Sequence, residues 1–129
     1  MSKLNLAATE TPVAFLYVTD RARALAFYEG VLGLKLRSAD AFGDYIQMNG
    51  ALLRMTVMPD YVARPHPELA WNVADIRAVV ETLRDAGVHC TRYPGMEQDE
   101  LGIWTSPDGA SKVAFFNDPD GNVLSISQG

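Results

Sequence analysis

The sequence predicts an α+β fold of two tandem βαβββ modules that form a curved mixed sheet, a cup with the helices on its outer face. The main observation is an internal repeat, in which residues 18–33 (VTDRARALAFYEGVLG) align with residues 73–87 (VADIRAVVETLRDAG). Each copy follows a short apolar run and precedes several more, with turn residues between them. Because neither predicted helix can bury its apolar face alone, we expect two copies side by side, with helices on one face and a concave second face.

Each copy of the repeat begins with a helix signal. Asp20 and Asp75 stand where an N-cap residue is expected. Behind each aspartate, apolar residues recur with the spacing of one helical face. Gly33 and Gly87 are expected to end the two helices as C-terminal caps.

The predicted strands alternate with turn signals. In the first half they cover residues 13–18, 34–38, 44–49 and 51–58, and in the second half residues 68–73, 88–93, 101–106, 112–117 and 122–127. Asn49-Gly50 and Pro107-Asp108-Gly109 predict hairpin turns. We therefore expect a single domain over residues 1–129, with module one at about 12–58, a proline-rich linker at 59–67 and module two at about 68–127.

Residues 115–126 (FFNDPDGNVLSI) place acidic and amide side chains at alternate positions, as a calcium loop does. Counting from Asp118, such a loop needs glycine at position 6 and glutamate at position 12, but Val123 and Gly129 stand there. Gly121 can adopt a positive φ, and Asp118 can accept bonds from the backbone ahead of it. The segment therefore predicts a turn between two strands.

Composition narrows the function classes. A net charge of −5 argues against nucleic-acid binding. No apolar run approaches the ~20 residues that span a bilayer, and no basic amphipathic helix suggests a membrane surface. Cys90 is the only cysteine, so the expected location is the reducing cytoplasm.

The segments TDRARALAFYEGVLGLKL (19–36) and VAFFNDPDGNVLSI (113–126) give the chain a family resemblance. The layout resembles the vicinal oxygen chelate superfamily, which includes glyoxalases, bleomycin resistance proteins, extradiol dioxygenases and fosfomycin-resistance enzymes. The resemblance covers about residues 12–127. It implies that the paired modules form a cup that holds a small organic ligand, and that the protein is a homodimer.

Metal-dependent members of this superfamily place ligands at positions that correspond here to Val13, Glu68 and Ser125. A fourth position corresponds to Arg54, with the register of that strand left open. Valine cannot bind a metal, serine is a poor neutral ligand, and arginine would repel a cation. His66 either reaches the cup or is a solvated linker residue. We therefore expect no cofactor, with a divalent metal as the alternative.

Strand alternation defines the expected ligand-binding set. Its members are Val13, Phe15, Tyr17, Arg54, Met58, Glu68, Trp104 and Ser125. Arg54 either pairs with Glu68 across the former metal position, binds a ligand carboxylate or phosphate, or is a surface arginine if the register slips by one residue. Trp104 suits the pocket and core packing equally, whereas Trp71 is expected on the helix-packing side.

Three functions remain open. The first is a small-molecule-binding protein of the glyoxalase/bleomycin resistance type, without a catalytic metal, that binds an apolar or aromatic compound in the cup. The second is an enzyme, either a glyoxalase-like lyase, isomerase or dioxygenase with non-standard metal ligands, or a metal-free enzyme with Glu68 or a tyrosine as base. The third is a subunit with only an interaction role. The sequence identifies no catalytic residue.

Overall fold

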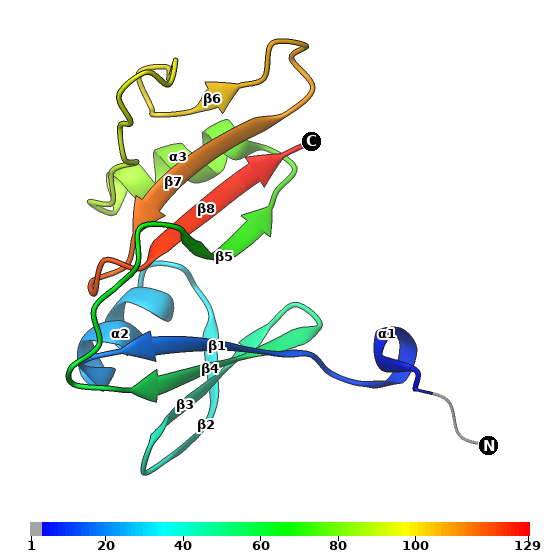
Figure 1. Ribbon diagram of the computed structural model, residues 1–129, viewed down its shortest axis with the longest axis vertical. Helices are drawn as coiled ribbons and strands as arrows, with labels where there is room; N and C mark the ends of the chain where they lie inside the picture. Colours follow the sequence, from blue (N-terminus) through cyan, green and yellow to red (C-terminus); the bar gives the residue numbers. More distant parts are fainter. Residues whose placement is uncertain (1–3) are drawn as a thin grey trace. The chain divides into compact units, whose positions relative to one another are not determined.

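The computed structural model describes residues 4–129. The chain separates into two compact units, one ending at Tyr61 and the other beginning at Val62. Each unit contains one four-stranded mixed sheet and one helix of the repeat (Figure 1). Over these described residues, no helix is long and apolar enough to cross a membrane. The βαβββ order predicted for each module is therefore present twice.

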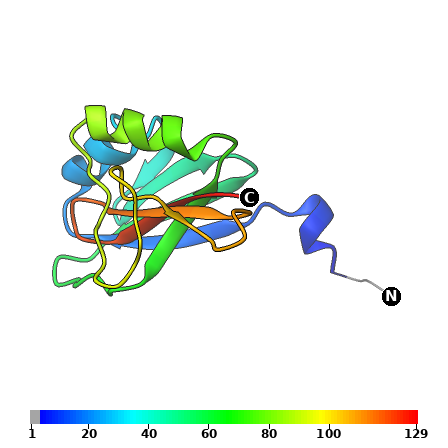
Figure 2. The same cartoon turned by 90° about the horizontal axis from the view of Figure 1, so that it is seen from above.

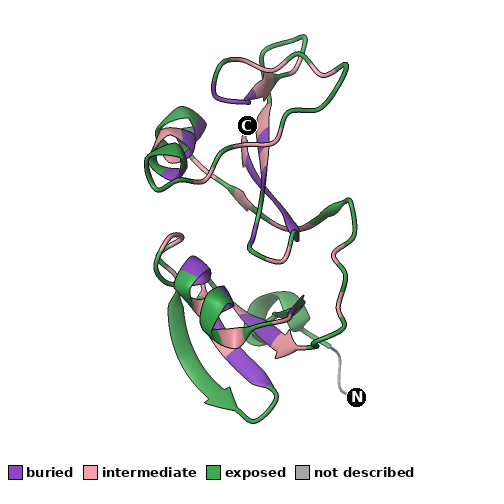
Figure 3. Cartoon of the chain, turned by 90° about the vertical axis from the view of Figure 1, so that its left-hand side faces the viewer, coloured by how far each residue is buried: buried purple, intermediate pink, exposed green. Residues whose placement is uncertain are grey.

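Module one is the unit that ends at Tyr61. Its elements are α1 (Leu6–Thr9), β1 (Val13–Val18), α2 (Arg21–Tyr28), β2 (Lys35–Asp40), β3 (Gly43–Met48) and β4 (Ala51–Val57). The strand order is β1-β4-β3-β2, in which β1 runs parallel to β4 and the hairpins are antiparallel. β2 is an edge strand that is exposed along its whole length (Figure 3).

Module two is the unit that begins at Val62. Its elements are β5 (Pro67–Asn72), α3 (Ile76–Asp85), β6 (Trp104–Thr105), β7 (Lys112–Asn117) and β8 (Val123–Gln128). The strand order β5-β8-β7-β6 repeats the pattern of module one, since β5 runs parallel to β8. The α3 helix lies over one face of this sheet (Figure 2).

Both N-cap predictions are confirmed. The Asp20 carboxylate accepts the backbone N–H of Arg23 at 3.1 Å, and Asp75 accepts that of Ala78 at 3.1 Å. Gly87 has a φ of +87° just beyond α3. The prediction for Gly33 was wrong in part, because α2 ends at Tyr28 and Gly33, at φ +75°, instead closes the turns that follow the helix.

The core of module one lies between α2 and one face of its sheet. The fully buried residues Leu16, Ile46 and Met55 occupy cross-strand positions on that face. Asp44 is also buried there, and its carboxylate receives two bonds from the Arg21 guanidinium, at 2.8 and 3.2 Å. This paired charge fixes the start of α2 to β3.

The core of module two likewise lies between its helix, α3, and one face of its sheet. Residues of β7, β8 and α3 form it: Ala114, Phe116, Leu124, Ile126, Ile76, Val80 and Leu83. Trp71 is the cross-strand partner of the buried Ile126, so it lies on the helix-packing side, as predicted.

The turn between β7 and β8 confirms the interpretation of the run DPDGN. The Asp118 carboxylate accepts the backbone N–H groups of Asp120 and Asn122, both at 2.9 Å, and the Asn122 side-chain amide at 2.8 Å. Gly121 has a φ of +87°. All three donors lie within one turn, so Asp118 and Asn122 serve a structural role.

The strand predicted at residues 88–93 is wrong, and the one predicted at 101–106 is reduced to β6. Only one backbone bond, from Thr91 N–H to the carbonyl of Phe115 at 2.7 Å, joins the first segment to β7. The side-chain amide of Gln98 takes the place of a partner strand. It donates to the carbonyls of Thr91 and Gly102 at 2.9 Å and accepts the N–H of Tyr93 at 2.9 Å.

Candidate functional site

The sheet of module one has a second face, opposite to α2, which we call the open face of module one. Phe15 of β1, Arg54 of β4 and Tyr45 of β3 are cross-strand neighbours on it. Phe15 is 69% exposed, whereas Val13 and Tyr17, at alternate positions on the same strand, are 40% and 39% exposed. Exposed apolar and aromatic side chains in a row on one strand are the composition expected of a ligand-binding surface.

Arg54 lies at the centre of this open face and is not a surface arginine. Its side chain is only 10% exposed. Nη2 donates to Oδ1 of Asp40 at 2.9 Å, and the guanidinium lies 4.7 Å from the ring centroid of Tyr45. Nη1 is buried and has no hydrogen-bond partner among the residues that the structure describes. The guanidinium is therefore held in place from two sides and has a free donor.

Asp40, at the end of β2, has two roles. Its Oδ1 accepts the backbone N–H groups of Phe42 and Gly43, at 2.9 and 3.1 Å, and thereby closes the β2–β3 hairpin. The same oxygen receives Arg54, and this hydrogen bond lowers the pKa of the Asp40 carboxyl, assisted by the Phe42 N–H. Asp40 was not predicted from the sequence, although an aspartate before a short turn was an available signal. Tyr45 was considered as a hydrogen-bond donor to a ligand or as an acid or base, with packing in the sheet as the alternative.

The register of β4, which the sequence left open, is now defined. Arg54 pairs with Phe15, and Ser125 pairs with Ala70. Phe15 and Ala70 each stand five residues before their N-cap aspartate, so Arg54 and Ser125 occupy equivalent positions in the two modules. The assignment of Arg54 to a metal-ligand position of the family stays a prediction.

Module two has its own open face, opposite to α3. Ser125 lies there, buried at 7% exposure. Phe115 is its cross-strand neighbour, and the ring of Phe115 meets that of Tyr93 edge-on at 5.5 Å. Trp104 of β6 pairs with Val113, which alternates with the buried Ala114, so Trp104 also belongs to this face. Of the two roles weighed for Trp104, its position on the strand favours the pocket.

Glu68 lies at an irregular point of β5, where the register shifts between Pro67 and Leu69. Its Oε1 is buried and has no hydrogen-bond partner in the described part of the chain. The Nε of Arg64 lies 3.5 Å away, which makes an ion pair without hydrogen-bond geometry. His66 is exposed in the same segment. The predicted pairing of Glu68 with Arg54 stays a prediction.

The residues at the positions that the family resemblance assigns to metal ligands do not suit a divalent metal ion. Val13 offers no donor atom, Arg54 is a fixed cation, and Ser125 offers one neutral hydroxyl. Within residues 4–129, no group of three or more histidine, cysteine, aspartate or glutamate side chains is placed to hold an ion. A lone carboxylate, that of Glu68, does not make a transition-metal site.

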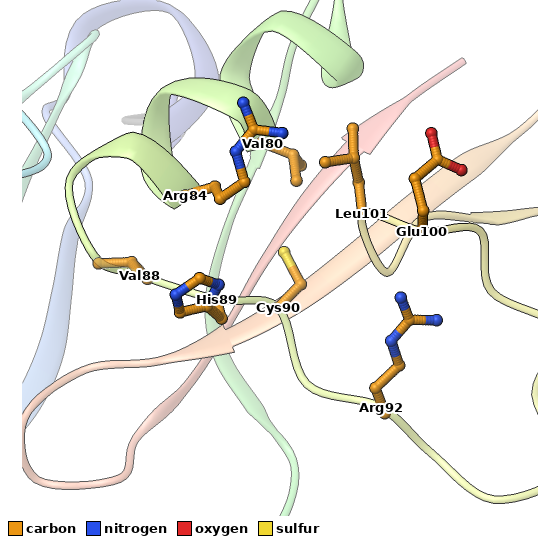
Figure 4. Close-up of a pocket in the computed structure, with 8 residues that line it drawn as sticks. All are labelled: Val80, Arg84, Val88, His89, Cys90, Arg92, Glu100 and Leu101. Atoms are coloured by element: carbon orange, nitrogen blue, oxygen red, sulfur yellow. The ribbon is translucent and has the colours of Figure 1, made fainter.

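A separate pocket of about 290 Å³ opens on the α3 side of module two (Figure 4). Its lining residues are Val80, Arg84, Val88, His89, Cys90, Arg92, Glu100 and Leu101. Burial raises the pKa of the Cys90 thiol, although the nearby Arg92 acts in the opposite direction. The thiol is thus kept protonated rather than activated as a nucleophile. This pocket could not be predicted from the sequence because three separate segments form it.

Two βαβββ modules, each with a mixed sheet covered by a helix on one face and lined with aromatic side chains on the other, define an α+β protein of the vicinal oxygen chelate class. The chain belongs to the Glyoxalase/Bleomycin resistance protein/Dioxygenase superfamily, whose family model matches residues 9–126.

Individual relatives agree with this membership. The chain is 28% identical over 129 residues to a probable lactoylglutathione lyase of Vibrio cholerae, covering 88% of this chain and 86% of the relative. It is 30% identical over 122 residues to the uncharacterized protein YaeR of Escherichia coli, covering 84% and 87%. Its fold is similar to that of a glyoxalase family protein from Enterococcus faecalis, with a TM-score of 0.73 at 20% identity and coverage of 93% and 98%.

Proposed function

We propose that this chain is a small-molecule-binding protein of the glyoxalase/bleomycin resistance type, which binds an apolar or aromatic compound and uses no catalytic metal. The observation that carries the proposal is Phe15, an aromatic side chain 69% exposed at the centre of a strand. Val13 and Tyr17 extend the same apolar strip along β1. A flat hydrophobic compound would cover this strip and remove apolar surface from water.

The same face supplies polar points that can orient a ligand. Arg54 lies beside Phe15 on the neighbouring strand β4, and Tyr45 lies beside Arg54 on β3. Met58, 42% exposed, follows the end of β4. A mostly apolar surface with a few polar groups is typical of sites for small organic molecules. Ser125 and Trp104 give the open face of module two a similar mixture of aromatic and polar groups.

The absence of a metal is proposed from donor chemistry. Elemental analysis of protein purified without metal-affinity steps tests it, and we expect less than about 0.1 equivalent of nickel, zinc, manganese or iron. A matched measurement of thermal unfolding with each ion should show no stabilisation, because only ligands that bind the native state raise the melting temperature. Stoichiometric metal, together with a rise in melting temperature on adding it back, would refute this part of the proposal.

Similarity to the probable lactoylglutathione lyase of Vibrio cholerae supports an enzyme as the second candidate. Such an enzyme would need unusual ligands or a base such as Glu68, whose buried Oε1 has no hydrogen-bond donor within the described residues. An assay for formation or cleavage of lactoylglutathione, with and without added metal ions, distinguishes this candidate. Turnover that disappears in Glu68→Gln but survives in Glu97→Gln would favour the enzyme.

We propose further that the protein forms a homodimer and works in the cytoplasm. The support for a dimer is β2, an exposed edge strand that pairs with β3 on one side only. The support for the location is the single half-buried cysteine, which suits a reducing compartment. Light scattering coupled to size-exclusion chromatography measures the mass directly, and a mass of one chain at 50 μM would exclude a stable dimer.

A further inference from the structure

Arg54 combines properties that mark an anion-binding group. Its side chain is nine-tenths buried, Asp40 and Tyr45 hold its guanidinium, and Nη1 lacks a partner among the described residues. A buried donor without an acceptor costs free energy, which an incoming oxygen atom would recover. Because the guanidinium is already fixed, little side-chain entropy remains to be lost when an anion binds.

We propose that the ligand on the open face of module one carries an oxyanion, a carboxylate or a phosphate, and that Nη1 of Arg54 donates to it. This inference rests on the small-molecule binding proposed above and specifies the class of ligand. The aromatic or apolar body lies against Phe15, and the anionic group lies over Arg54. Phe15 and Arg54 are partners on neighbouring strands, which lie about 4.8 Å apart, so one compact molecule can reach both.

Asp40 does not cancel the attraction of Arg54 for an anion. The Asp40 side chain is 49% exposed, so water solvates its charge, whereas the Arg54 side chain is 10% exposed. Asp40 accepts its hydrogen bond from Nη2, whereas Nη1, the other terminal nitrogen of the guanidinium, has no acceptor in the described residues. Charge-assisted hydrogen bonds in a partly desolvated site are about twice as strong as neutral ones.

The affinities of matched pairs of compounds for the whole 129-residue chain test the oxyanion preference separately from the proposed function. The probes are 1-naphthoate and 1-naphthyl phosphate, each against the neutral 1-naphthamide, with inorganic phosphate alone as a fourth arm. Dissociation constants come from calorimetry. The variants are Arg54→Gln, which removes the charge, Arg54→Lys, which keeps the charge but not the fork, and Arg23→Gln on α2 as the matched loss of one exposed positive charge.

For the wild-type chain and Arg23→Gln we expect a naphthalene oxyanion to bind about 10- to 100-fold more tightly than the amide, which is the range for one charge-assisted bond. Arg54→Gln should reduce that preference to less than about threefold without abolishing binding of the amide. Arg54→Lys should retain part of it, and it keeps the test valid if Arg54→Gln does not fold. Comparison of the carboxylate with the phosphate shows which oxyanion fits better.

Other outcomes overturn the inference in distinguishable ways. If the wild-type chain binds the amide as tightly as the acids, the proposed function stands and the oxyanion preference is refuted. If the preference persists in folded Arg54→Gln, another group receives the anion. If inorganic phosphate binds Arg23→Gln and Arg54→Gln equally and no naphthalene compound binds, both the inference and the proposed function fail.

Discussion

The substitution Phe15→Ala should lower the affinity for a ligand and leave the stability of the fold nearly unchanged. The side chain is 69% exposed, and since a buried phenylalanine removes about 200 Å² from water, roughly 140 Å² remain open. A flat ligand that covers one side of the ring buries about 70 Å² of it. At about 25 cal/mol per Å² this contributes about 1.7 kcal/mol. We therefore expect affinity for naphthalene probes to fall about 20-fold.

The stability of Phe15→Ala should change little. Exposed side chains away from caps, cores and charge networks usually contribute within about 0.5 kcal/mol. Calorimetric titration with 1-naphthoate gives the affinity, and urea unfolding followed by circular dichroism gives the free energy of unfolding. Phe42→Ala is the matched control, because Phe42 is 72% exposed in the same module but lies at the β2–β3 hairpin rather than on the open face.

Two results would refute this reasoning. Equal losses of affinity in Phe15→Ala and Phe42→Ala would show that the open face is not where the probe binds. A loss of unfolding free energy above about 2 kcal/mol in Phe15→Ala would be that of a buried aromatic residue. In that case Phe15 is covered in solution, and light scattering would show whether a second copy covers it.

Three further predictions concern the scaffold. Asp118→Ala removes three hydrogen bonds to buried or half-buried donors, two of which belong to Asn122. The free energy of unfolding should therefore fall by about 3 kcal/mol. A loss of less than about 1 kcal/mol in urea unfolding would contradict the structural role of Asp118 in the turn. Gly43→Ala places a Cβ against the backbone of β4 and should lower the melting temperature by about 10 °C or more, whereas an unchanged melting temperature would show that the strands separate freely. In an NMR titration the pKa of the Asp40 carboxyl should lie below its ordinary value of 3.8. The ionised carboxylate therefore stabilises the fold fully above that pH, and this stabilisation is lost as the pH falls through the lowered pKa. In Arg54→Gln the pKa of Asp40 should rise, and an unchanged pKa would contradict the contact between Asp40 and Arg54.

Local signals explain what the sequence could predict. An N-cap aspartate such as Asp75 and a turn such as DPDGN depend on bonds within four residues, so their outcome is determined nearby. Strand alternation predicted the side of Arg54 because β4 has no irregularity in its pairing with β1 and β3. These features made the βαβββ order and one open face predictable.

Long-range contacts explain what the sequence could not predict. The segment 88–93 has the composition of a strand, but its backbone groups bond to the side chain of Gln98. The burial of Arg54 depends on Asp40 and Tyr45, on two other strands. No periodicity within one segment reports such a partner, and the same holds for the pocket around Cys90.

The shared acceptor in module one has a mechanical consequence. One carboxylate oxygen, Oδ1 of Asp40, anchors both the hairpin tip and the guanidinium. A bound molecule that shifts Arg54 toward itself would change the hydrogen bond that Nη2 donates to that oxygen. The amide hydrogens of Phe42 and Gly43 would then exchange with solvent at a different rate, so these two backbone positions would report whether the site is filled.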